Sequence, residues 1–318
     1  MAADVARIER MQVTRTSLVD GKTPGPRPKR VGPPHAPFRG ERRSLNPPLL
    51  WLRRDANLGF GSSLGGAHMA TDTDIIALAD RSPLVGFNWP GRGLAPRAYI
   101  HGMAVAFGRL LTVLLANDDG SATSKAVAVA TASQIGAPKA DVLAWYAAEL
   151  AAAGATTATA EDRLVALFSI MLGLGMRESS GQHCVGADTA ADRQAPTTEA
   201  DAEAGLFQVS FDSIGGDPLR KSLFDEYVDR TDLLDVFSVG VKCRPSDLQN
   251  VGTGDGSKFQ AAMKNCPLFA VLYTAQFLRG HRTHWGPINR KEAQVRADAV
   301  TLFNGVRALP GTAGVPVA

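Results

Sequence analysis

The segment from residue 159 to 176 constrains the fold of this 318-residue chain more than any other. Thr159 suits the N-cap of a helix, and Asp162 occupies the third helical position, where a carboxylate complements the positive end of the helix dipole. Between residues 164 and 176 nearly every residue is apolar, so no face of such a helix suits contact with water. We therefore predict a central, fully buried helix whose last turn delivers Glu178 to an edge of the core.

Most of the remaining regular pattern is also helical. TDTDIIALADRS and RAYIHGMAVAFGRLLTVLLAND carry apolar residues at helical spacing, and Ala-rich segments follow them. GLFQVSFDS, directly after a polar stretch, is the best candidate for a short strand or hairpin. The 45% content of hydrophobic residues is enough to fill a core. The expected fold is mostly α (α+β), with a small β element after the buried helix.

These patterns divide the chain into four predicted parts. They are a Pro/Arg-rich, disordered tail over residues 1–70, an additional (accessory) helical region over 71–158, a domain over 159–307 that begins with the buried helix and a flexible C-terminus over 308–318.

The net charge of +3 does not by itself argue for a nucleic-acid partner. The charge is concentrated, however, between residues 22 and 54, where nine basic residues and eight prolines accompany one acidic residue. Such a segment is typical of a solvated linker. The alternative is an arm that contacts an anionic polymer, such as cell wall, nucleic acid or lipid headgroups.

The first residues do not have the pattern of a secretory signal, because charges at Asp4, Arg7 and Glu9 interrupt any apolar stretch. The longest apolar runs are interpreted as too short to span a bilayer, and the first contains Arg109. We expect a soluble protein without a transmembrane segment. A substrate outside the cytoplasm would require export to the periplasm or cell wall by a non-standard route.

Three cysteines are too few for a disulfide scaffold and lack the paired spacing of a zinc site. Cys243 and Cys266 are candidates for a disulfide across a Gly/Asp/Ser-rich loop, provided that the compartment is oxidising. We predict no metal and no cofactor.

Glu178 is the strongest candidate for chemistry. Beside apolar side chains such as Met176 and, across a cleft, Phe207, its carboxyl group is expected to be desolvated, which raises its pKa towards neutrality. A general acid needs that state in order to protonate a glycosidic oxygen. The structural alternative is a surface glutamate that pairs with Arg177 or a later arginine.

Two motifs together resemble the lysozyme-like superfamily, in particular bacterial lytic transglycosylases and goose-type lysozymes. They are ESSG at residues 178–181 and GLFQVS at 205–210, with Phe207 in place of the usual methionine. The resemblance implies a lysozyme-like helical lobe and Glu178 as the acid/base. The segment between the motifs, residues 182–204, is longer than is usual in this superfamily and looks like an insertion.

The predicted substrate-binding residues surround these motifs: Ser179, Gly205, Leu206, Phe207, Gln208, Ser210, Tyr273 and Trp285. Gly205 would allow close approach of the backbone to a sugar, and Gln208 offers both a donor and an acceptor. Phe207 would form an apolar wall. Trp285 lies in HRTHWGPIN, which either stacks on a sugar or packs as a loop, and whose histidines lack a third partner for zinc.

The predicted function is that of a lytic transglycosylase, a muramidase that cleaves the MurNAc–GlcNAc β-1,4 bond of peptidoglycan with one glutamate. A hydrolase of the inverting kind needs a second carboxylate, for which the candidates are Asp188, Asp192, Asp201 and Glu203. Goose-type enzymes often have an aspartate where this chain has Ser210, which favours the transglycosylase. The alternatives are a non-catalytic glycan-binding or structural module and a hydrolytic lysozyme or chitinase-type glycosidase.

Overall fold

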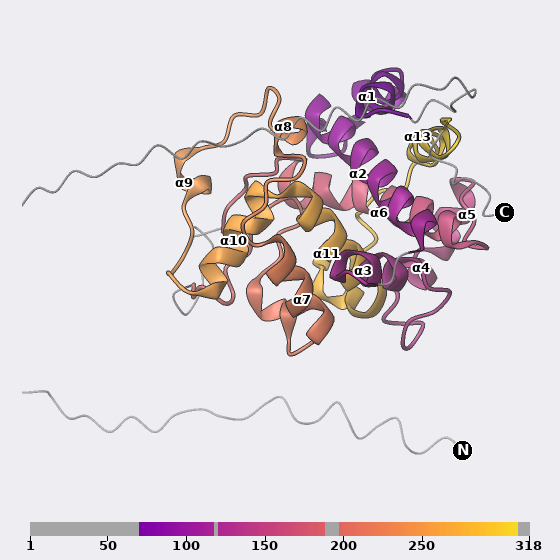
Figure 1. Cartoon of the computed structure of the whole chain (residues 1–318). Coiled ribbons are helices and arrows are strands. Elements are labelled where there is room, and N and C mark those ends of the chain that lie inside the picture. Colours follow the sequence, from indigo (N-terminus) through magenta and orange to yellow (C-terminus); the bar gives the residue numbers. More distant parts are fainter. Residues whose placement is uncertain (1–69, 118–119, 188–196, 311–318) are drawn as a thin grey trace, which may run out of the picture. The chain divides into compact units, whose positions relative to one another are not determined.

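Helices account for most of the residues that the computed structural model describes, which are 70–117, 120–187 and 197–310 (Figure 1). The longer helices are α1 (Asp72–Asp80), α2 (Arg97–Ala116), α3 (Ala122–Thr131), α6 (Ala160–Ser179), α7 (Pro218–Tyr227), α10 (Asp255–Asn265), α11 (Pro267–His281) and α13 (Ala297–Arg307). The shorter ones are α4 (Val142–Trp145), α5 (Ala147–Ala152), α8 (Leu234–Phe237), α9 (Pro245–Leu248) and α12 (Gly286–Asn289), with 3-10 turns η1 (Pro83–Gly86), η2 (Phe211–Ile214) and η3 (Arg282–His284). The prediction of a mostly α fold is confirmed.

The central helix α6 forms where the sequence predicts it. Thr159 is its N-cap, and the Thr159 and Asp162 side chains form a reciprocal capping box with each other's backbone N–H groups. Every residue from 164 to 176 is buried. The helix packs against α2, α3 and α13 and contacts α4, α11 and α12, so apolar neighbours surround it.

Two glycines of α6 allow neighbouring segments to approach its backbone. A Cβ on Gly175 would overlap the hydroxyl oxygen of Tyr99, and one on Gly173 would lie 2.5 Å from the carbonyl oxygen of Gln294. The Tyr99 hydroxyl donates to the carbonyl oxygen of Leu172 at 2.9 Å. Because Tyr99 belongs to α2, the first helices and the central helix share one hydrophobic core. All described residues, on both sides of residue 158, fall in one compact unit.

A buried ion pair also connects the two predicted regions. The Arg279 guanidinium of α11 is fully buried and donates to both carboxylate oxygens of Asp141 at 2.9 Å. It also donates to the carbonyl oxygens of Ala130 and Ala132, at the end of α3. These four hydrogen bonds compensate for the desolvation of both charges.

Replacing Arg279 by Met is expected to lower the free energy of unfolding by about 3 kcal/mol, because Asp141 then stays buried without its cation. Urea denaturation measures the change. The control is Lys221→Met, which removes a surface ion pair with Asp225 and should cost less than about 1 kcal/mol. Equal effects of the two substitutions would contradict this account of the core.

Strands are few and short in the described parts of the chain. β1 (Asn88–Trp89) and β2 (Gly93–Leu94) form an antiparallel hairpin before α2, which the sequence analysis does not predict. At the GLFQVS segment one antiparallel bridge joins Ala204, the residue before it, to Val209. The predicted β element after the buried helix thus consists of a single bridge closing a tight turn.

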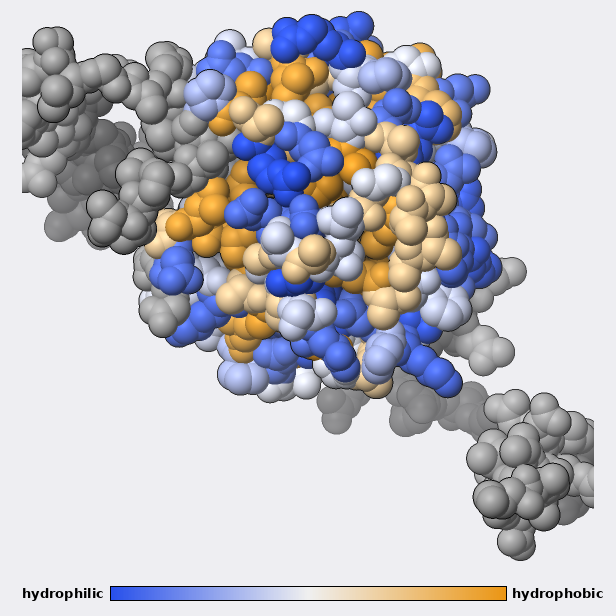
Figure 2. Space-filling model, turned by 90° about the vertical axis from the view of Figure 1, so that its right-hand side faces the viewer, coloured by the Kyte–Doolittle hydropathy of each residue, from blue (hydrophilic) through white to orange (hydrophobic). Residues whose placement is uncertain are grey.

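By length and composition, helix α2 is long and apolar enough to cross a membrane. The interpretation that the longest apolar runs are too short to span a bilayer is therefore wrong for this helix. In the folded chain, however, 67% of its most apolar window is buried, as in a core helix of a folded domain. On one face of the molecule, hydrophilic and hydrophobic residues are interspersed in small groups (Figure 2). Large hydrophobic side chains that are exposed in the described residues are scattered singly, at Leu94, Val239 and Leu248.

The predictions for residues 1–69 and 311–318, including those for the 22–54 basic segment, lie outside the described residues.

Candidate active site

Glu178 lies in the last turn of α6 and lines a groove with a cavity volume of about 540 Å³. We call this the Glu178 groove; its other lining residues are Val185, Gly186, Ala187, Gln208, Arg244, Ser246, Asp247, Gln249, Asn250 and Val251. The side chain is half-buried, and no described residue forms a hydrogen bond or ion pair with its carboxylate. The alternative partner Arg177 instead binds Glu292, with Nη2 and Oε2 2.9 Å apart. Glu178 is therefore available to a ligand.

The glycine of the ESSG motif ends the helix that carries Glu178. Ser180 and Gly181 both adopt left-handed backbone angles, with φ of 54° and 74°. The Gly181 N–H donates to the Gly175 carbonyl and the Ser180 N–H to the Met176 carbonyl, which satisfies the last turn of α6. A Cβ on Gly181 would lie 2.8 Å from the Tyr99 ring. Backbone geometry and packing therefore both require glycine here.

Burial, together with the nearby carboxylate of Glu203, raises the pKa of Glu178 to about 7. The positive charges of Arg92, Arg177 and Arg290 act in the opposite direction. The raised pKa predicted from the sequence is confirmed. A glutamate that holds its proton near neutral pH can act as a general acid.

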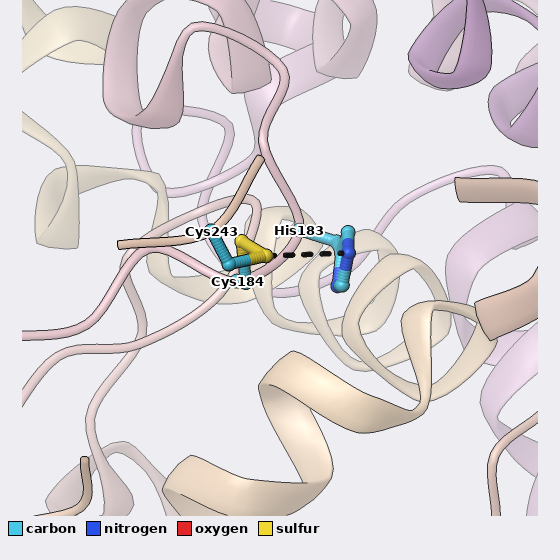
Figure 3. A group of neighbouring side chains, drawn as sticks. All are labelled: His183, Cys184 and Cys243. Atoms are coloured by element: carbon cyan, nitrogen blue, oxygen red, sulfur yellow. Dashed lines mark hydrogen bonds between the residues drawn. A yellow bond between two sulfur atoms is a disulfide. The ribbon is translucent and has the colours of Figure 1, made fainter. Parts of the chain in front are cut away.

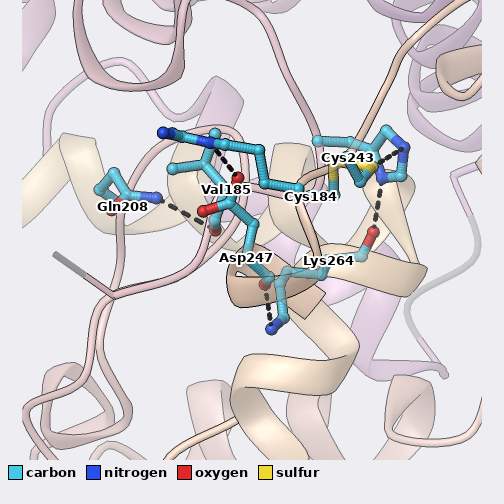
Figure 4. The surroundings of a disulfide bond; sticks show 8 residues. Cys184, Val185, Gln208, Cys243, Asp247 and Lys264 are labelled. Atoms are coloured by element: carbon cyan, nitrogen blue, oxygen red, sulfur yellow. Dashed lines mark hydrogen bonds and ion pairs between the residues drawn. A yellow bond between two sulfur atoms is a disulfide. The ribbon is translucent and has the colours of Figure 1, made fainter. Parts of the chain in front are cut away.

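Gln208 is the second predicted site residue that lines the groove. It has a left-handed φ of 49°, and its side-chain nitrogen donates to the carbonyl oxygens of Gly205 at 2.9 Å and Val185 at 3.3 Å. These bonds fix the amide between the turn and the segment that follows α6 (Figure 4). Within the described chain, no donor binds the amide oxygen of Gln208, so this oxygen is available to a ligand.

Gly205 has a different role from the predicted one. It is buried, with φ of 76°, and a Cβ there would lie 2.5 Å from the carbonyl oxygen of Met263 in α10. Its N–H donates to the Val185 carbonyl at 2.8 Å. The glycine is therefore needed for contact with α10, not for approach to a sugar.

Six other predicted contact residues are buried and do not line the Glu178 groove: Ser179, Leu206, Phe207, Ser210, Tyr273 and Trp285. The indole N–H of Trp285 donates to the Phe207 carbonyl at 2.8 Å, and the Tyr273 hydroxyl lies 2.7 Å from that of Ser213. The Ser179 hydroxyl donates to the carbonyl of Gly175 within α6. Trp285 therefore supports the GLFQ turn, which carries Gln208, from inside the core.

A disulfide bond joins Cys184 to Cys243, which corrects the predicted pair of Cys243 and Cys266. Cys266 is a buried free thiol. The bond connects the segment after α6 to the loop before α9, and both segments line the Glu178 groove. The cross-link therefore holds the two walls together.

His183 lies beside this disulfide (Figure 3). Its Nδ1 is 2.9 Å from the Lys264 carbonyl oxygen, and its Nε2 is 3.9 Å from the sulfur of Cys243. The ligand atoms of His183, Cys184 and Cys243 lie within 4.8 Å of one another, a spacing suitable for a metal. The bond between the sulfurs removes both thiolates that a metal would need.

The second wall of the groove is held by Lys264 of α10, as Figure 4 shows. Its buried ammonium donates to the carbonyl oxygens of Asp247 and Gln249 at 2.8 Å. A Cβ on Gly186 would lie 2.8 Å from the same Asp247 oxygen, so the walls touch there. The sequence shows only a Gly/Asp/Ser-rich loop between Cys243 and Cys266 and carries no signal for this wall.

Of the candidate second carboxylates, Asp188 and Asp192 lie outside the described residues. Asp201 is exposed and accepts a hydrogen bond from the backbone of Thr198. Glu203 is close enough to act on the pKa of Glu178. Among the candidate second carboxylates that the structure describes, Glu203 is therefore the one whose charge affects the pKa of Glu178.

A scan against protein-family models finds no match, and searches of curated proteins and of solved structures find none either.

Proposed function

We propose that this protein is a peptidoglycan-cleaving lytic transglycosylase in which Glu178 is the general acid and then the base. The observation that carries the proposal concerns the Glu178 carboxyl group. This group lines a groove, has a pKa of about 7 and forms no hydrogen bond or ion pair with the described residues. The two-motif resemblance supports the same assignment. Of the predicted contacts, Gln208 remains as the group that orients the substrate.

In the proposed reaction the Glu178 carboxyl group donates its proton to the glycosidic oxygen while the bond from that oxygen to C1 breaks. The resulting carboxylate then accepts the proton of the C6 hydroxyl as its oxygen bonds to C1. The product is a 1,6-anhydro sugar, and Glu178 is again protonated. No second carboxylate is required.

A hydrolase is the second candidate, because Glu203 is close enough to Glu178 to act on its pKa. In that case Glu203 would activate water, and the products would carry reducing ends. Replacing Glu203 by Gln separates the two reactions, since only the hydrolase requires this carboxylate.

The Cys184–Cys243 disulfide supports the proposal that the protein acts outside the cytoplasm. Disulfides persist in oxidising compartments such as the periplasm. Peptidoglycan lies in the same compartment.

The rate of cleavage is expected to fall as the pH rises through about 7. Burial raises the pKa of Glu178 to about 7, so the carboxyl group is mostly protonated below this pH and mostly ionised above it. The measurement is kcat/KM for soluble glycan fragments between pH 5 and 9, with circular dichroism as a control for folding. A rate that increases steadily through pH 7 to 9 would contradict a protonated Glu178 as the acid.

A further inference from the structure

A second, smaller pocket lies beside the Glu178 groove and has a cavity volume of about 220 Å³. We call it the Arg92 pocket. The β1–β2 hairpin, the end of α6 and the segment after α12 line it, through Trp89, Arg92, Met176, Arg177, Lys291 and Glu292. It is smaller than pockets that enclose a whole drug-sized ligand, so it suits one group of a larger molecule.

The Arg92 pocket has an excess of positive charge, since three cations and one carboxylate line it. Glu292 is shared between Arg177 at 2.9 Å and Arg290 at 2.7 Å. Lys291 binds Glu149 at 2.8 Å. The exposed side chain of Arg92 forms no hydrogen bond or ion pair with any other described residue. Its charge is therefore available to an anion.

Two residues that line the Arg92 pocket carry buried donors without a hydrogen-bond partner in the described part of the chain. The indole N–H of Trp89 is buried and has no hydrogen-bond partner among the residues that the structure describes. The same is true of the Nε of Arg177. Unpaired buried donors are uncommon in folded proteins, and they add to the positive potential of the pocket.

The hairpin holds Arg92 in a defined place. The Arg92 backbone N–H donates to the Trp89 carbonyl at 2.9 Å, and Gly91 and Gly93 both adopt left-handed φ angles that close the turn. The Trp89 ring is 3% exposed and contacts the Phe87 ring edge to face. The turn thus needs little reorganisation when a ligand binds.

The Arg92 pocket adjoins the candidate catalytic group. Met176 and Arg177 line the pocket, and the next residue of the same helix turn, Glu178, lines the groove. The charges of Arg92 and Arg177 also act on the pKa of Glu178, so both arginines lie near the carboxyl group that a sugar chain in the groove would contact.

We propose that the Arg92 pocket is an anion subsite that binds a carboxylate carried by the glycan, close to the bond that is cleaved. This inference rests on the proposed function and adds a preference for acidic over neutral amino-sugar polymers. The carboxylate belongs either to the lactyl ether of the sugar or to its stem peptide, which share the same chemistry towards Arg92.

The test measures equilibrium binding to the full chain with Glu178→Gln, so that the ligands stay intact. Three ligands are compared: peptide-bearing muramyl oligosaccharides, the same oligosaccharides without peptide, and neutral chitin oligosaccharides. Arg92→Gln is expected to weaken binding of at least one acidic ligand about tenfold, without weakening binding of chitin oligosaccharides. The matched control is Arg97→Gln, an exposed arginine that pairs with Asp80 and does not line the pocket.

The Arg92→Lys variant, which keeps the charge, should retain part of the affinity and shows that the effect is electrostatic. A loss confined to peptide-bearing ligands identifies the stem peptide, and a loss confined to peptide-free ligands identifies the lactyl group. Unchanged binding of both acidic ligands, or an equal loss for chitin oligosaccharides, would overturn the subsite. Because binding is measured without turnover, this result is independent of whether the parent protein cleaves glycan.

Discussion

Replacing Glu178 by Gln is expected to lower the rate of peptidoglycan cleavage by about 10²- to 10⁴-fold, the usual contribution of a general acid. The amide occupies nearly the same volume but cannot donate a proton to the glycosidic oxygen and then take one back. The affinity for glycan should change much less than the rate. Single-turnover digestion of purified peptidoglycan, followed by chromatography of soluble fragments, measures the effect.

The matched control is Glu161→Gln, the same substitution in the first turn of the same helix and away from the Glu178 groove. It should leave cleavage unchanged.

Stability provides a second readout of the environment of Glu178. The folded protein raises the pKa of this group from 4.5 to about 7, so ionisation in the fold costs stability as the pH rises between these values. Glu178→Gln removes that cost. The variant should therefore become more stable relative to the parent from pH 5 to 8, which would exclude misfolding as the cause of lost activity.

The second large effect is expected on removal of the Cys184–Cys243 disulfide. The bond closes a loop with a sequence separation of 59 residues, for which chain entropy predicts a loss of about 4 kcal/mol in the free energy of unfolding. Because the bond joins the two walls of the Glu178 groove, the double Cys184→Ser, Cys243→Ser variant should also have weaker glycan binding. Urea denaturation and equilibrium binding measure the two losses.

Reductant distinguishes this effect from that of the substitutions themselves. The parent protein should lose stability on reduction, whereas the double variant should not respond. The control Cys266→Ala, which removes the buried free thiol, should keep the parent's sensitivity to reductant. A parent protein with equal stability in both conditions would contradict a stabilising disulfide.

The sequence was most informative about α6, because the relevant signals are local. A threonine cap, an acidic first turn and an unbroken apolar run specify a buried helix without knowledge of its neighbours. The position of Glu178 follows from where that run ends. Its raised pKa follows from burial, which the same run predicts.

Other features depend on contacts between distant segments, which one sequence does not contain. Trp285 donates to Phe207, 78 residues away, and this contact makes both residues part of the core instead of a sugar-binding surface. The partner of Cys243 is set in the same way, by the folding of the segment after α6 against the loop before α9. Composition and spacing favoured Cys266 as the disulfide partner of Cys243, because Cys266 is nearer to it in the sequence.

The β1–β2 hairpin was missed for a different reason. Strands of two residues have no periodicity to detect. The Pro90-Gly91-Arg92-Gly93 run was the available signal, because such runs are typical of tight turns. This hairpin carries the residue on which the proposed anion subsite depends.

The most direct test of the central claim is mass spectrometry of the soluble products from purified peptidoglycan, incubated with the parent protein or with Glu178→Gln. The account predicts fragments with 1,6-anhydro ends from the parent protein and none from the variant. Reducing-end fragments would contradict the transglycosylase and favour a hydrolase that uses Glu203. Equal amounts of fragments from both proteins, or none from the parent with retained binding, would contradict the assignment of Glu178 as the catalytic acid.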